Sequence, residues 1–103
     1  MAKYIIHFTA NPQAWPTHAT AAVELWEGTA SAATALLDAG TLSTIDWTSN
    51  MEGYATLEAA SKAVAIQVAA AFFPFFTQTI EELVPWSEAS AAILAGVRAA
   101  AEG

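Results

Sequence analysis

His7 is the side chain in this sequence best suited to acid–base chemistry, and it lies in the middle of the apolar run Lys3–Thr9. A free imidazole has a pKa of about 6.5, which suits a general base near neutral pH. Two interpretations stay open at this point. His7 is either a base in a pocket or a core histidine satisfied by backbone or by a carboxylate. His18 lies in a loop beside Thr17, where we expect a surface residue.

Asp46 and Glu58 are the carboxylates that we assign to work with His7. A carboxylate beside a histidine orients the ring and stabilises its protonated form. Glu58 is predicted on the strand next to that of His7, and Asp46 one strand further away. With both side chains on one sheet face, His7 and a carboxylate could remove a proton next to a carbonyl group.

Four aromatic residues are candidates for the wall of a ligand site. Trp26 lies on the apolar side of a predicted helix, and Tyr54 lies on a predicted strand. Phe72 and Phe75 belong to the stretch FFPFF around Pro74. For each of them the alternative is plain core packing, and a buried Tyr54 hydroxyl would then donate to the backbone.

The composition excludes several classes of partner and cofactor. Three basic residues against ten acidic ones give a net charge of −7, so no basic patch can hold nucleic acid. The chain has no cysteine, and its two histidines form no metal motif with nearby acids. No GxGxxG, GxxxxGK[ST] or GxSxG occurs, so we predict neither a cofactor nor a metal.

The most apolar segment, residues 63–76, is too short for a membrane-spanning helix of about 20 residues. Gln67 and Pro74 also interrupt it, so we predict no membrane role. Residues 1–8 show neither the long apolar stretch nor the cleavage site of a signal peptide. We therefore expect a cytoplasmic protein.

Apolar periodicity and capping signals predict seven elements in one domain, residues 1–103. The predicted strands are residues 3–9, 41–48, 54–59 and 77–86, and the predicted helices are residues 20–39, 62–73 and 87–103. We expect Thr17 or Thr20, Ser61 and Ser87 to cap the helices and Gly40 to end the first.

The order β-α-β-β-α-β followed by a helical extension is that of the α+β, ferredoxin-like arrangement, with both helices on one face of a four-stranded sheet. Charged residues make up only 13% of the chain, against about 25% in an average protein. A homodimer or a larger homo-oligomer would bury apolar surface that so few charges leave uncovered. We predict that two sheets pair across the dimer.

The stretches AAFFPFFTQTIEELVPW and GYATLEAASKAV, with the opening YIIHFTANPQAWP, are similar to the small muconolactone isomerase-like proteins. That family resemblance covers the chain to about Trp86 and implies a dimeric α+β barrel. It also implies a cofactor-free enzyme that isomerises, or moves a proton on, a small and largely apolar substrate. The alternative is a non-catalytic homo-oligomer that binds an apolar ligand or serves in an assembly.

Overall fold

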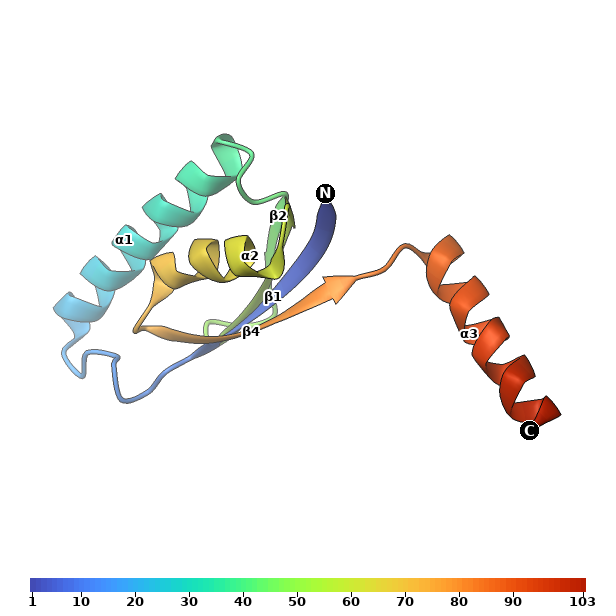
Figure 1. Cartoon of the computed structure of the whole chain (residues 1–103). Coiled ribbons are helices and arrows are strands. Elements are labelled where there is room, and N and C mark those ends of the chain that lie inside the picture. The colour runs from blue at the N-terminus through green and yellow to red at the C-terminus, as the bar shows by residue number, and fades with distance from the viewer.

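The computed structural model describes residues 1–103 and shows a small α+β protein with one four-stranded sheet and three α-helices (Figure 1). The elements in chain order are β1 (Ala2–Ala10), α1 (Ala19–Asp38), β2 (Thr44–Trp47), β3 (Glu52–Ala59), α2 (Lys62–Ala69), the 3-10 helix η1 (Ala70–Phe72), β4 (Phe76–Leu83) and α3 (Trp86–Glu102). The predicted α+β class is confirmed.

The strands form an antiparallel sheet in the order β2-β3-β1-β4, so β1 is central. Within this sheet His7 of β1 lies opposite Tyr54 of β3 and Thr79 of β4. Successive side chains of a strand point to opposite sides, so each strand contributes alternate residues to two faces. α1 and α2 lie over one of them (Figure 1), which we call the covered face.

No helix lies over the other side of the sheet, which we call the open face (Figure 1). Its residues follow from the alternation and the strand register, and they are Lys3, Ile5, His7, Thr9, Thr44, Asp46, Glu52, Tyr54, Thr56, Glu58, Thr77, Thr79, Glu81 and Leu83. None of them is buried. Threonines and carboxylates dominate this set, whereas the covered face carries the core.

The core is small and lies between the covered face and the helices. Only 13 of the 103 residues are buried, so most of the apolar side chains keep some exposed surface. The buried side chains of the strands include Ile6, Leu57 and Phe76, and α2 adds Ala65 and Ala69. α1 contributes no buried residue and packs through partly buried side chains. Because α1 packs only through partly buried side chains, space remains between α1 and the sheet.

Two of the predicted helix ends are confirmed and two are corrected. Ser61 precedes α2, and its hydroxyl accepts a hydrogen bond from the Val64 amide at 3.4 Å. Gly40 follows α1 with a φ of 76°, a conformation that glycine adopts without steric cost. The N-cap of α1 is His18, and neither Thr17 nor Thr20 occupies it.

The predicted cap Ser87 is also wrong, because α3 begins at Trp86 and Pro85 holds the N-cap position. β4 ends at Leu83, three residues earlier than predicted, since the extended Val84–Pro85 link already leaves the sheet. β2 is shorter than predicted for another reason. Leu42 is buried, and its amide donates to the Leu36 carbonyl at 3.1 Å, which ties this segment to the end of α1.

α3 stands away from the rest of the molecule (Figure 1), and none of its residues is buried. The molecule therefore measures 62 × 28 × 22 Å, with a radius of gyration of 17.5 Å. A compact chain of this length has a radius of about 13 Å. None of the three α-helices combines the length and the apolar character that crossing a bilayer requires.

Candidate functional site

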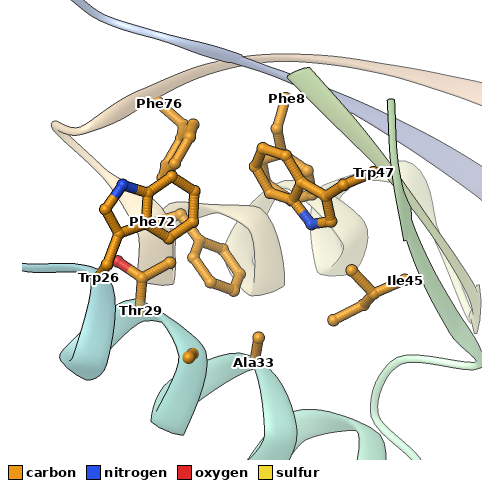
Figure 2. A pocket seen from close by; sticks show the side chains of 9 residues that line it. Phe8, Trp26, Thr29, Ala33, Ile45, Trp47, Phe72 and Phe76 are labelled. Carbon is orange, nitrogen blue, oxygen red and sulfur yellow. The ribbon is translucent and has the colours of Figure 1, made fainter. Parts of the chain in front are cut away.

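The most enclosed apolar pocket lies between α1 and the covered face of the sheet (Figure 2). Its volume is about 160 Å³. The nine lining residues are Phe8, Trp26, Thr29, Ala30, Ala33, Ile45, Trp47, Phe72 and Phe76. Thr29 is the only one of them that is not hydrophobic. The pocket therefore offers apolar contact and no charged group.

Aromatic rings form one continuous wall of this pocket. Phe76 is the centre of the wall, because its ring meets those of Trp26, Trp47 and Phe8 in edge-to-face contacts at 5.8, 5.3 and 6.3 Å between centroids. Such T-shaped pairs are favoured by the quadrupoles of the rings. Phe72 completes the wall from η1, meeting Phe8 at 5.1 Å. Figure 2 shows these side chains converging on the space above α1.

Gly53 on β3 makes room for the Trp47 ring. A Cβ atom added to Gly53 would collide with three atoms of the Trp47 indole. Glycine inside a strand commonly marks such a close approach. Because Trp47 is one wall of the pocket, the absence of a side chain at Gly53 sets how far this wall stands from α1. Gly53 is thus a shaping residue of the pocket.

His7 lies on the open face, on the other side of the sheet from the pocket. Its ring stacks on Tyr54 with 4.5 Å between centroids and 8° between planes. The Nε2 atom lies 3.3 Å from Glu52 Oε1, although the two are not aligned for a hydrogen bond. The side chain is 32% exposed, yet Nε2 itself is sealed from solvent and lacks a hydrogen-bond partner.

The predicted carboxylate partners of His7 share its face but lie further away than Glu52. Glu58 is opposite Lys3, four positions along β3 from Tyr54, which corresponds to about 13 Å along the strand. Asp46 lies in the same row as Tyr54 but two strands from His7, about 10 Å away. The expected geometric partnership of His7 with Glu58 is therefore corrected to Glu52.

The predicted ligand-binding residues divide between the two faces. Trp26 and Phe72 line the pocket. Tyr54 is on the open face beside His7. Phe75 lies outside the pocket and borders a shallower depression beside it, while its carbonyl accepts the Trp15 indole N–H at 3.0 Å. Phe76 takes the position that Phe75 was expected to have.

Several residues of the site were missed from the sequence. Glu52 and Gly53 lie outside the predicted strand of residues 54–59, whereas both belong to β3. Phe8 could have been found, because it alternates with the two buried residues Tyr4 and Ile6 along β1. The period-2 pattern of this strand already predicts that Phe8 and His7 point to different faces.

A depression on the open face brings the polar candidates together. Ile5, His7, Tyr54, Thr79 and Glu81 line it. No group of three His, Asp or Glu side chains is close enough to hold a metal ion. The polar side chains of this depression could exchange protons with a ligand, whereas the lining of the apolar pocket could only enclose one.

Burial and charge alter one titratable group on the covered face. Burial raises the pKa of the Tyr4 hydroxyl, and the neighbouring Glu82 carboxylate raises it further. The two residues are cross-strand partners on β1 and β4. This end of the covered face therefore holds a neutral phenol beside a carboxylate, away from the apolar pocket.

Comparison with known proteins assigns this chain to no family. No protein-family model matches it, and no curated protein matches it either. The similarity to muconolactone isomerase-like proteins therefore stays a prediction from the sequence.

Proposed function

We propose that this protein binds a small apolar molecule in the pocket between α1 and the sheet. One observation carries the proposal: eight of the nine lining residues are hydrophobic, and five of these are aromatic side chains of the strands, α1 and η1. Ligand pockets are commonly apolar and aromatic, with few polar groups that set orientation. Here the lining surface is almost entirely apolar, so the shape of the aromatic wall would orient the ligand.

The volume narrows the class of ligand. A dry, apolar cavity of about 150 Å³ in another protein holds a benzene molecule. A pocket of about 160 Å³ therefore fits a single substituted ring or a compact hydrocarbon of similar size. An uncharged ligand is favoured, because no cation lines the pocket to pair with an anion.

A thermal-shift titration with toluene and with benzoate tests this function. A ligand that binds only the folded protein stabilises it by RT ln(1 + [L]/Kd), so the melting temperature rises with ligand concentration. We expect toluene to raise it and benzoate to have no effect. Ala33→Leu fills the pocket and should abolish the toluene shift. The matched control is Ala35→Leu, the same change at an exposed position of α1.

If Ala33→Leu responds to toluene as fully as the unmodified protein and Ala35→Leu, the ligand does not occupy this pocket. The proposal is then wrong.

A second candidate function is proton transfer at the open face, supported by the unpartnered Nε2 of His7 beside Glu52. In this version His7 removes a proton next to a carbonyl group, and Glu52 stabilises the imidazolium that forms. A protein of this kind exchanges the α-protons of small enolisable lactones for deuterium, which NMR detects. His7→Ala should end the exchange, and His18→Ala, at the exposed other histidine, should keep it.

If exchange persists in His7→Ala, this mechanism is excluded. The two candidates are separable, because Ala33→Leu alters only the pocket and His7→Ala alters only the open face.

The resemblance and the uncovered sheet also support a finer proposal on architecture. The antiparallel order β2-β3-β1-β4, with α1 and α2 on one face, supports a ferredoxin-like arrangement. Pairing of two open faces would then form a dimeric α+β barrel. Each open face carries four carboxylates, so we expect salt to strengthen this pairing by screening their repulsion. Sedimentation equilibrium at low and high salt measures the effect.

A further inference from the structure

The apolar side of α3 has no partner within its own chain. Trp86, Ile93, Leu94 and Val97 recur at helical spacing on this helix, and all four are exposed. We call them the α3 stripe. A 17-residue helix without tertiary contacts is only marginally stable in water, because most helix stability in proteins comes from packing of an apolar face. The α3 stripe therefore needs a surface to cover it.

A matching surface lies between α2 and the edge strand β4. This groove is lined by Lys62, Ile66, Ala69, Ala70, Phe73 and Ile80, together with one glutamine. Ile66 and Phe73 are exposed large apolar side chains. The small alanines between them leave a channel in which a helix can lie. We call this surface the α2–β4 groove.

Charge favours the groove over the open face as the site that receives α3. The open face carries Asp46, Glu52, Glu58 and Glu81, and an apolar helix laid across them would remove these carboxylates from water without a partner. The groove holds a single charge, Lys62, at the start of α2. α3 has an acidic residue near each end, so Lys62 can meet a carboxylate in either helix direction.

The link between β4 and α3 favours a groove on a second copy. Only Val84 and Pro85 separate the two elements, and Pro85 is extended, with φ −54° and ψ 143°. Proline fixes φ, so this link cannot easily reverse the chain onto its own groove. Short hinges of this kind favour exchange of the following element between two copies.

The surface that α3 would bury in the α2–β4 groove is large enough for a specific interface. A helix of 17 residues is about 26 Å long and about 10 Å wide. Two symmetric helix-in-groove contacts would bury on the order of 1,000 Å², which reaches the size expected of a biological interface.

We propose that α3 of one copy lies in the α2–β4 groove of a second copy, so that two chains exchange their C-terminal helices. This contact does not depend on a ligand in the pocket or on pairing of the open faces. It gives the 17 residues of α3 a packing role that the isolated chain cannot provide.

Cysteine cross-linking tests the exchange directly, since the natural chain has no cysteine to interfere. Ile66→Cys places a thiol in the groove, and Val97→Cys places one on the α3 stripe. Under mild oxidation, a mixture of the two single variants should give a disulfide-linked dimer on a non-reducing gel. Val23→Cys in place of Ile66→Cys is the matched control, because Val23 is 56% exposed and Ile66 52%.

Three results of this experiment would overturn the proposal. Strong cross-linking of Val97→Cys alone would mean that two α3 helices pair with each other. An intrachain disulfide in the Ile66→Cys/Val97→Cys double variant, without any dimer, would mean that α3 folds back. Equal cross-linking of the Val23→Cys control would mean random collision.

Trypsin cleavage at Arg98 is a second readout that needs no correct thiol geometry, because Arg98 is the only basic residue of α3. Helix exchange predicts slow loss of residues 99–103 at high protein concentration and several-fold faster loss on dilution. Ile66→Asp should accelerate the cleavage, and Val23→Asp should not. Protection that is independent of concentration, or insensitive to Ile66→Asp, contradicts the proposal.

Discussion

The two faces of the sheet are built from the same four strands, yet they differ in almost every physical property. The covered face carries buried aliphatic and aromatic side chains and forms one wall of an uncharged pocket. The open face carries threonines, four carboxylates and His7, and none of its residues is buried. Apolar enclosure and acid–base groups are therefore separated by the thickness of the sheet.

This separation shows why neighbours in sequence need not share a site. His7 and Phe8 are adjacent residues, but the strand turns one toward Tyr54 and the other toward Phe76. A ligand enclosed by the aromatic wall cannot reach the imidazole without passing through the sheet. The binding function and the proton-transfer function thus require different surfaces, and variants on the two faces can tell them apart.

The largest difference in stability between the two faces is expected when an aromatic side chain of each face is replaced by alanine. Phe76→Ala removes the central ring of the covered face, where 2% of the residue is exposed, and should lower the free energy of unfolding by about 3–5 kcal/mol. Tyr54→Ala on the open face should cost less than about 1 kcal/mol. Urea denaturation at low protein concentration measures both. Similar losses would mean that the open face is covered in solution.

Two adjacent isoleucines give a matched aliphatic comparison. Ile6 is fully buried on the covered face, and Ile5 is half-buried on the open face. Ile6→Ala should lower the free energy of unfolding by about 2–4 kcal/mol, and Ile5→Ala by about 1 kcal/mol or less. The measurement is repeated over a range of protein concentrations. A cost of Ile5→Ala that grows with concentration would indicate that open faces pair.

Glycine-to-alanine changes compare a crowded position with an empty one. Gly53→Ala should lower the free energy of unfolding by about 1–3 kcal/mol, because the new methyl group forces Trp47 to move. It should also change the toluene affinity, since Trp47 lines the pocket. Gly28→Ala meets no atom within 4 Å and should raise stability by about 0.5–1 kcal/mol, as alanine favours a helix interior. If both variants changed the free energy of unfolding in the same direction, this interpretation of Gly53 would be contradicted.

The smallest effect is expected for Tyr4 of the covered face at high pH. Burial and Glu82 raise the pKa of Tyr4, so the folded state holds this proton more tightly than the unfolded state does. The stabilisation is fully present below pH about 10 and is lost as pH rises through the folded pKa. Tyr4→Phe should flatten the fall in stability above pH 10. Melting curves at pH 8–11 measure this change.

The fold was largely predictable because its signals are local. Each of these signals can be recognised in a stretch of a few residues. They are the alternation of apolar and polar side chains in residues 3–9 and 54–59, the capping residue Ser61 and the helix-ending Gly40. The errors concern the predicted first and last residues of the helices and strands, because tertiary contacts determine where these elements begin and end. Leu42 left the predicted strand because its amide bonds to the end of α1. The caps predicted at Thr17 and Ser87 were wrong, because His18 precedes α1 and Pro85 precedes α3.

The site was less predictable because it depends on strand register. Glu52 reaches His7 only through the exact pairing of Thr9 with Glu52 and of His7 with Tyr54, which composition does not encode. A shift in pairing would have favoured another carboxylate. Phe75 and Phe76 are chemically identical, and only the bend at Pro74 decides which of them enters the pocket. The need for Gly53 follows from the position of a ring that lies on a different strand.

The positions of the tryptophans have a spectroscopic consequence. Trp15, Trp26 and Trp47 form a chain of indoles with 5.2 and 5.8 Å between successive centroids. Excitation energy passes readily among rings this close. Trp86 stands apart on α3 and is 76% exposed within its own chain, so it has the red-shifted emission of an indole in water as long as no second copy covers α3. The unmodified protein thus carries two distinguishable fluorophores, one beside the pocket and one on the C-terminal helix.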